Sequence, residues 1–193
     1  GRTEEKFSVW TAYGTEKILQ SFDYSSRTKE KTLTINAFQN EYESAQIIIS
    51  AETDVKSYVV EKSDLKHTDG KSVISSDCFT LYNQKYINVT KIYNKNGNWQ
   101  LGMYPDALLP FDVAVQYGEN VVKAGENQGI WVQLKVPKGQ KAGSYNGSFT
   151  LRTGSKSVGI PVNVAVFDFE ICDESHSKGS YAIYREHLGW GEQ

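Results

Sequence analysis

The sequence contains few of the residues that build metal centres or covalent cross-links. Its 193 residues include two cysteines, Cys78 and Cys172, which are too few for a disulfide scaffold and fit no zinc-binding spacing. We interpret both as free thiols, because free cysteine packs like a small apolar residue, with a bridge between them as the alternative. None of the three histidines belongs to a recognisable metal-binding motif, so we predict no metal site and no cofactor.

Long apolar runs and a strong charge excess are also missing. No apolar run approaches the roughly 20 residues of a membrane-spanning helix, so we predict no membrane span. The formal net charge is -2, and the basic residues are scattered, whereas phosphate binding needs a concentrated basic surface. We therefore predict no nucleic-acid partner. The sequence also has no Gly-x-Ser-x-Gly elbow and no phosphate-binding glycine loop.

What the sequence does contain is a series of period-two patterns that are typical of strands. Aliphatic and amphipathic residues alternate over 130–136, Pro137 ends that strand, and a polar turn precedes a second alternating run over 145–152. The run over 160–166 is the most regular, and its Pro161 indicates an edge position or a bulge. We predict further strands within 7–19, 33–36, 45–49, 58–60, 79–82 and 86–93, with a polar loop over 63–76.

These strand signals predict an all-β fold. No helical pattern interrupts them before residue 175, which favours an antiparallel two-sheet β-sandwich of the immunoglobulin or fibronectin kind over an α/β arrangement. A hydrophobic share of 39% with 12% aromatic residues is sufficient for a packed core. We predict that residues 1–175 form this sandwich as one domain.

The C-terminal residues follow a different pattern. After a polar connector, the segment from Tyr181 to Trp190 carries large apolar and aromatic residues with nothing after it to cover them. We interpret residues 176–193 as a linker and the first piece of a following domain. The alternative is a C-terminal strand that packs back onto the sandwich.

The best candidate for a surface site is the segment 98–110, which we predict to be a loop because a glycine and two prolines punctuate it. Trp99, Tyr104 and Asp106 offer aromatic faces beside a carboxylate. This combination suits a sugar ring, whose C–H groups stack on aromatic faces while its hydroxyls form hydrogen bonds. The alternative is a stiff crossover loop whose aromatic residues pack on the core or on a neighbouring domain.

A second candidate is the pair of carboxylates that flanks Tyr42. Glu41 and Glu43 are two residues apart, so on a strand they would share a face. A glycosidase pair needs carboxylates roughly 5 to 9.5 Å apart, which this spacing permits. We favour a polar turn before the next strand over a catalytic pair.

Five short segments occur in a recognisable order over most of the chain. They are Asn-Glu-Tyr-Glu-Ser-Ala-Gln at 40–46, Tyr-Pro-Asp-Ala-Leu-Leu-Pro at 104–110, Gln-Gly-Ile-Trp-Val at 128–132, Ala-Gly-Ser-Tyr-Asn-Gly at 142–147 and Phe-Asp-Phe-Glu at 167–170. Together they resemble the N-terminal β-sandwich of proteins that carry the domain of unknown function 4091, which are related to glycoside hydrolase family 123. The family usually continues with Leu-Pro where this chain has Ile171-Cys172.

This resemblance implies an accessory β-sandwich placed before a (β/α)-barrel. Enzymes of glycoside hydrolase family 123 are β-N-acetylgalactosaminidases, in which an adjacent Asp and Glu of the barrel act together with the acetamido group of the substrate. Those positions lie downstream of this chain, so no catalytic residue is carried over. Residues 176–193 would then be the linker and the first strand and loop of a truncated catalytic barrel.

Two functional hypotheses from different classes follow from these observations. The first is a non-catalytic accessory domain of a bacterial glycoside hydrolase that acts on N-acetylhexosamine-containing glycans, with its own C-terminal catalytic barrel as partner. The second is a free-standing carbohydrate-binding module, with Trp99, Tyr104 and Asp106 as the sugar platform and Trp131 as a further contact. A structural, adhesin-like sandwich is a third. We expect a secreted, cell-surface or periplasmic protein whose signal peptide has been removed.

Overall fold

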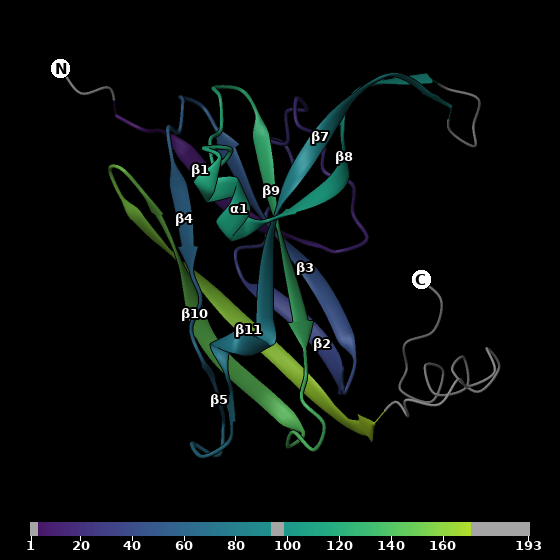
Figure 1. Ribbon diagram of the computed structural model, residues 1–193, viewed down its shortest axis with the longest axis vertical. Helices are drawn as coiled ribbons and strands as arrows, with labels where there is room; N and C mark the ends of the chain where they lie inside the picture. Colours follow the sequence, from purple (N-terminus) through teal and green to yellow (C-terminus); the bar gives the residue numbers. More distant parts are fainter. Residues whose placement is uncertain (1–3, 94–98, 171–193) are drawn as a thin grey trace.

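The computed structural model describes residues 4–93 and 99–170, of which 88–106 and 170 are described by their backbone alone. These residues form mostly strands (Figure 1). In chain order the elements are β1 (Phe7–Tyr13), β2 (Leu33–Gln39), β3 (Tyr42–Ala51), β4 (Tyr58–Glu61), β5 (Leu65–His67), β6 (Val73–Ile74), a 3-10 turn (Ser76–Cys78), β7 (Phe79–Tyr93), β8 (Trp99–Pro110), α1 (Phe111–Gln116), β9 (Asn127–Lys135), β10 (Gly143–Thr153) and β11 (Ser157–Glu170).

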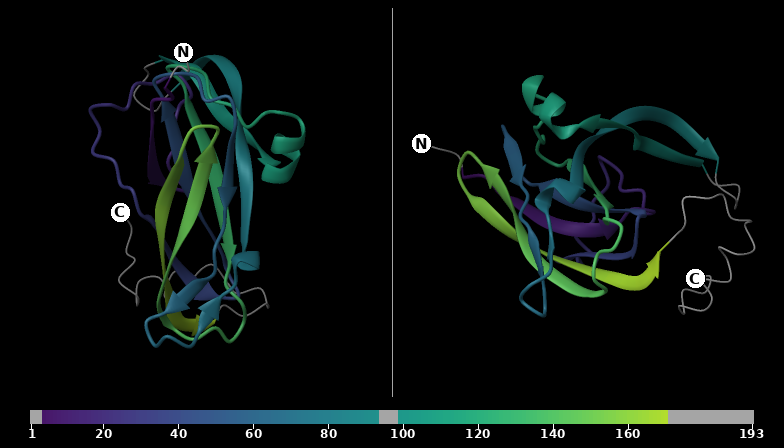
Figure 2. Two further views of the ribbon diagram at one scale, coloured as in Figure 1. Left: turned by 90° about the vertical axis from the view of Figure 1, so that its left-hand side faces the viewer. Right: turned by 60° about the horizontal axis from the view of Figure 1, so that its bottom comes forward.

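The strands build two sheets that pack face to face, so the predicted all-β sandwich is confirmed (Figures 1 and 2). Sheet A has the strand order β1-β3-β9-β7-β8. Sheet B has the order β2-β11-β10-β5-β6, and β4 also pairs with β10. Chain-neighbouring strands are often in different sheets, which is why the sandwich depends on long-range pairing.

One strand pair departs from the antiparallel prediction. β2 runs parallel to β11, with Leu33 opposite Val162 and Phe38 opposite Phe167. These two strands come from opposite parts of the chain, so no tight turn dictates their relative direction. Pro161 lies just before the first β2 partner of β11 and pairs with β10 alone, which agrees with its predicted edge-like position.

The core lies between the inward faces of the two sheets. Alternate residues of β3 and β9, such as Ile47 and Ile130, are fully buried, as the period-two pattern predicts. The rings of Phe79 on sheet A and Phe149 on sheet B meet edge to face, with centroids 5.1 Å apart. Tyr58 is also fully buried, and its hydroxyl donates to Asn83 Oδ1. Burial raises the pKa of this phenol, so it stays neutral and acts as a donor.

The segment predicted to be a loop, 98–110, is instead mostly strand β8, and this prediction was wrong. Gly102, Pro105 and Pro110 suggested a loop because proline cannot donate to a ladder. In the fold, β8 is the outermost strand of sheet A and pairs with β7 only. An edge strand tolerates proline on its open side, and prolines there also discourage pairing with another chain.

Three smaller features also differ from the sequence prediction. The strands predicted at 79–82 and 86–93 are one long strand, β7, which leaves the sandwich together with β8 as a two-stranded arm (Figure 1). The predicted loop over 63–76 contains the short strands β5 and β6. Helix α1, which was not predicted, has only six residues, too few for its period to be recognised in the sequence.

The described part of the sandwich ends with β11 at Glu170, five residues before the predicted domain boundary. The predicted linker and barrel start at 176–193 lie outside the described residues, and so does Cys172, so these remain predictions. Cys78 is a partly buried free thiol, and burial raises its pKa.

The edge-to-face contact between the two sheets leads to a stability prediction. We expect Phe149→Ala to lower the free energy of unfolding by about 3 to 5 kcal/mol, because it removes a fully buried ring and leaves a cavity. The control Phe22→Ala removes a ring that is 54% exposed and should cost less than about 1 kcal/mol. Urea unfolding followed by circular dichroism measures both. Equal losses in the two variants would contradict the assigned core.

A carboxylate fixes the turn between β5 and β6. Asp69 Oδ1 accepts from the backbone N–H groups of Lys71 at 2.7 Å and Ser72 at 3.0 Å, and Oδ2 lies 2.9 Å from Lys141 Nζ. The two backbone donors, followed by the Lys141 ammonium, hold the pKa of Asp69 well below its usual value. The ionised form is therefore favoured by folding.

This depressed pKa predicts a pH dependence of stability. The contribution of Asp69 is fully present above the unfolded-state pKa near ~3.9 and is lost as the pH falls through the lower folded-state pKa. We expect wild type to have a higher urea midpoint than Asp69→Asn at pH 7, and the difference to shrink as the pH falls below about 4. A difference that stays constant down to about pH 2.5 would show that the charge does not stabilise the fold.

Candidate functional site on the outer face of sheet A

A non-regular segment, residues 14–30, covers part of the outer face of sheet A; we call it the covering segment. Its Ile18 packs with Trp10 of β1 and Ile48 of β3 in a second small core, separate from the main one. Arg27 lies over the Trp10 ring, 5.0 Å from its centroid. Figure 2, left, shows the purple segment standing out from the side of the sandwich. The covering segment therefore buries the outer face around Trp10 and Ile48.

Buried side-chain amides fasten the covering segment to the sheet. Gln46 of β3 donates from Nε2 to the carbonyl oxygens of Tyr13 and Glu16, each at 2.7 Å. Its Oε1 accepts from Gln84 Nε2 of β7, also at 2.7 Å. Gln128 Nε2 in turn donates to the Gln84 carbonyl at 2.8 Å. The amides thus form a hydrogen-bonded relay across three strands. This relay supplies donors to the backbone carbonyls of Tyr13, Glu16 and Gln84.

Gly129 leaves room for the Gln84 amide of this relay. Gln84 Oε1 is, among the described residues, the buried side-chain polar atom without a hydrogen-bond partner. It lies so close to Gly129 that a Cβ added there would clash with this oxygen. The Gly129 N–H donates to the Tyr86 hydroxyl at 2.8 Å. Burial raises the pKa of Tyr86, so the phenol is neutral. A side chain at position 129 would therefore displace Gln84.

A pocket of about 260 Å³ opens where the covering segment begins. Its rim is formed by the first residues of the segment, and its walls by β3, β7, β8 and β9. Trp131 is partly exposed and lies directly opposite Gln46 on one side and Tyr82 on the other. Leu108 of β8 is 44% exposed. The lining residues are Gly14, Thr15, Glu16, Lys17, Gln46, Gln84, Ala107, Leu108 and Trp131. We call this the Trp131 pocket.

Of the four predicted site residues, Trp131 lines this pocket and the other three lie on the β7–β8 arm. Trp99 pairs with Tyr93 and Tyr104 with Ile87, whereas Trp131 is opposite Tyr82. Tyr104 is thus displaced by five positions along β7, or about 16 Å at ~3.3 Å per residue. The four residues do not share one row of the sheet.

Asp106 occupies a special backbone position on the same arm. Lys85 pairs with Ala107 and the next residue, Tyr86, with Pro105, which makes Asp106 the extra residue of a β-bulge. Bulges change the direction in which a side chain points. The side chains of Trp99, Tyr104 and Asp106 lie outside the described part of the structure, so their contact with a sugar or a domain stays a prediction.

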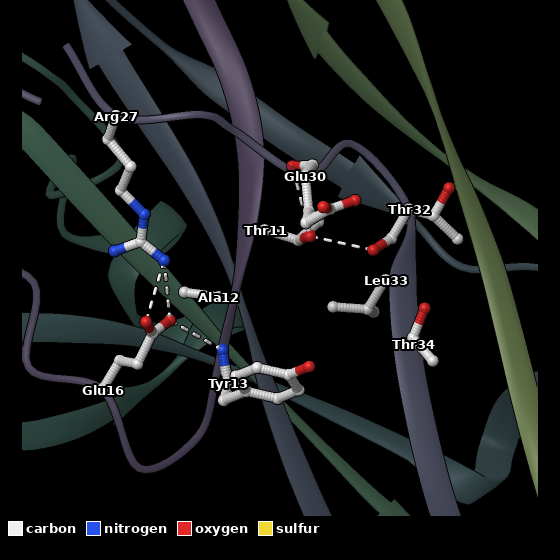
Figure 3. Close-up of a pocket in the computed structure, with 9 residues that line it drawn as sticks. All are labelled: Thr11, Ala12, Tyr13, Glu16, Arg27, Glu30, Thr32, Leu33 and Thr34. Carbon is white, nitrogen blue, oxygen red and sulfur yellow. Dashed lines mark hydrogen bonds and ion pairs between the residues drawn. The ribbon is translucent and has the colours of Figure 1, made fainter. Parts of the chain in front are cut away.

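A second pocket, of about 200 Å³, lies between the edge strands β1 and β2 (Figure 3). Glu16 pairs with Arg27 at 2.8 Å and also accepts from the Tyr13 N–H at 3.1 Å. On the opposite wall, Thr11 Oγ1 donates to the Thr32 carbonyl at 2.8 Å. Sequence patterns did not indicate this pocket, because most of its polar residues come from segments without periodicity.

The ion pair in this second pocket is structural. Both side chains are about one-third exposed, and such pairs contribute little to stability. Glu16 is held by a guanidinium and a backbone N–H, so it has no base-like environment. The pair links two residues that lie near opposite ends of the covering segment (Figure 3).

The carboxylate pair proposed from the sequence, Glu41 and Glu43, lies at the start of β3. Asn40 and Glu41 form the turn before β3, with Asn40 at a φ of 59°, as the turn interpretation predicts, whereas Glu43 already belongs to β3. Within 4–93 and 99–170, no three His, Cys, Asp or Glu residues are grouped as metal ligands would be. In the same ranges, no helix has the length and apolar character needed to cross a membrane.

Three of the segments that carry the family resemblance meet at the Trp131 pocket. Gln46 ends the first, Ala107 and Leu108 belong to the second, and Trp131 belongs to the third. These segments are far apart in sequence and come together in sheet A. Three of the five segments that resemble the family therefore line this pocket.

Comparisons with solved structures show what the fold is similar to. The structure of a family 123 glycoside hydrolase from Clostridium perfringens, which concerns glycolipid glycan hydrolysis, matches with a TM-score of 0.63 at 16% identity. The match covers 85% of this chain and 28% of that enzyme. The CooA pilin subunit of enterotoxigenic Escherichia coli matches with a TM-score of 0.42 at 11% identity, over 84% of this chain and 99% of the pilin. At these identities the comparison with the hydrolase shows the fold alone.

Comparison with protein families is more specific. No curated protein matches the chain. The model of the glycoside hydrolase 123 N-terminal domain matches residues 17–153, which include most of the covering segment, the walls of the Trp131 pocket and most of the sandwich. The predicted relation to glycoside hydrolase family 123 is thereby confirmed, whereas the link to the domain of unknown function 4091 stays a prediction. The chain belongs to the glycoside hydrolase 123 N-terminal domain family.

Proposed function

We propose that this chain is the non-catalytic accessory domain of a glycoside hydrolase that acts on N-acetylhexosamine-containing glycans, and that it braces a C-terminal catalytic barrel. The observation that carries the proposal is the match of residues 17–153 to an N-terminal domain of the family. The chain spans 28% of the similar family 123 enzyme. Most of such an enzyme therefore lies beyond a domain of this kind.

The chemistry of the described carboxylates supports a non-catalytic role. A glycosidase needs two carboxyl groups that face one substrate site, one of them with a raised pKa so that it serves as an acid. Glu16 is engaged by Arg27 and by the Tyr13 N–H. The strongly shifted carboxylate, Asp69, has a lowered pKa and belongs to a turn. The environment of Asp69 is therefore not that of a general acid.

An extracytoplasmic location is part of the same proposal. Glycans that contain N-acetylhexosamine are exposed on cell surfaces and in secretions, so an enzyme that degrades them is useful outside the cytoplasm. Fractionation of source cells, followed by detection of the protein with an antibody, tests this location. Detection in the cytoplasmic fraction alone would contradict it.

A sugar-binding module is the second candidate, and the partly exposed Trp131 is the observation that favours it. Binding of N-acetylgalactosamine to the chain, measured by isothermal titration calorimetry and abolished in Trp131→Ala with an unchanged circular dichroism spectrum, would support this candidate. Thermograms without heat of binding would remove it.

The accessory role predicts that the chain alone does not hydrolyse a glycoside. We expect no release of 4-nitrophenol from 4-nitrophenyl N-acetyl-β-D-galactosaminide above the buffer rate, because in this proposal the catalytic groups belong to the barrel that follows the sandwich. The control is a mock preparation, purified in the same way from cells that do not express the chain. Turnover that co-purifies with the chain and is absent from the mock preparation would refute the proposal, whereas equal turnover in both preparations indicates a contaminating enzyme.

A further inference from the structure

The covering segment leaves the other half of the outer face of sheet A uncovered, and we call this half the open face. It consists of the outward residues of β3, β9, β7 and β8 from the Trp131 pocket towards the start of β3. Tyr42 is 57% and Leu108 44% exposed. Trp131 and Tyr82 lie between them and are partly exposed. The outward side chains of the open face are aromatic or aliphatic at the Trp131 pocket and again at Tyr42, and the polar row of Ser44, Gln133 and Thr80 lies between them.

The chain leaves the sandwich beside the open face. At the end of β11, Glu170 pairs with Gln39, the last residue of β2. The turn Asn40–Glu41 then leads directly to Tyr42. Lys135 joins these parts, since its Nζ donates to the Asn40 carbonyl at 2.9 Å and lies 4.5 Å from the centre of the Tyr42 ring. The described chain therefore ends beside the turn that leads into β3, at the Tyr42 end of the open face.

The hydrogen bonds inside the Trp131 pocket indicate what kind of group it accepts. Both the Nε2 group of the Gln46 amide and its oxygen are used. Gln84 donates to Gln46, and its unpartnered oxygen has almost no accessible surface. A sugar needs free donors and acceptors at the floor of its site. The floor of this pocket instead offers the Trp131 ring and apolar groups of β8, which suit an apolar side chain.

We infer that the open face is the docking surface for the polypeptide that follows β11, and that an apolar side chain of this polypeptide fills the Trp131 pocket. The inference rests on the proposed function, in which that polypeptide is the catalytic domain. Leu108 and Trp131 form the anchor site, and Tyr42 and Lys135 form the part nearest the chain exit. The polar covering segment limits the surface on the opposite side.

Cysteine labelling measures directly whether the open face is covered. In a background with Cys78→Ser and Cys172→Ser, Leu108→Cys is compared with Val73→Cys on β6. Both native side chains are 44% exposed, so they make a matched pair on different sheets. Each variant is prepared in the 193-residue chain and in the longer protein that includes the catalytic domain. Maleimide labelling at each position is followed over time by peptide mass spectrometry.

We expect the thiols at positions 108 and 73 to react at similar rates in the 193-residue chain. In the longer protein, labelling at 108 should slow by at least about tenfold, while labelling at 73 should keep its rate. Equal rates at 108 in the two proteins would overturn the inference. Protection at 108 in the short chain that disappears on dilution would identify a second copy as the occupant. Protection of the short chain by N-acetylgalactosamine would identify a sugar site, and either result also overturns the inference.

A calorimetric measurement on the longer protein separates this inference from the proposed function. Phe149→Ala removes an inward ring of sheet B and leaves the outward residues of the open face unchanged, so it should lower the Tm at which the catalytic domain unfolds if the sandwich braces that domain. An unchanged Tm of the catalytic domain would overturn the bracing role itself. A lowered Tm, together with labelling at position 108 that is as fast as in the short chain, would keep the bracing role and overturn only the assignment of this face.

Discussion

The buried amide of Gln46 is the constraint on which the outer face of this domain depends. A polar group without partners is costly to bury. Gln46 uses its Nε2 group on the carbonyls of Tyr13 and Glu16 and its oxygen on Gln84. The covering segment is thereby held to sheet A at its first turn. Because the Gln84 amide lies directly against Gly129, a side chain at position 129 would push Gln84 out of the relay.

This relay explains why one part of the outer face of sheet A is covered while the other part is exposed. Over β1 and the adjoining part of β3, the covering segment buries Trp10 and Ile48 and adds a small core. Beyond Gln46 the sheet has no further cover within the described residues, and Trp131 marks the boundary. The pocket in Figure 3 lies on the far side of the same segment, where Glu16 and Arg27 close it. The covering segment thus lines both the Trp131 pocket and the pocket in Figure 3.

Local patterns predicted the fold better than they predicted the site. The strands β9, β10 and β11 follow from the period-two runs, because each has one face in the core. The strand β8 was missed, since proline and glycine indicate a loop unless one knows that the strand lies at an edge. Trp131 was recognised as a candidate, but its neighbours Gln46 and Gln84 were not. They meet it only through the long-range register of three strands, which no local pattern encodes.

A small contact surface is sufficient to hold a domain that is covalently joined to the sandwich next to that surface. The open face has one small pocket and a few exposed apolar side chains, which would bind a free partner only weakly. In the proposed arrangement, a catalytic domain joined through β11 has an effective concentration of the order of millimolar at this face, because the end of β11 lies near Tyr42. Weak contacts then give a stable arrangement. The exposed large apolar side chains of this face are few, among them Tyr42 and Leu108, which limits the tendency of the isolated sandwich to associate through it.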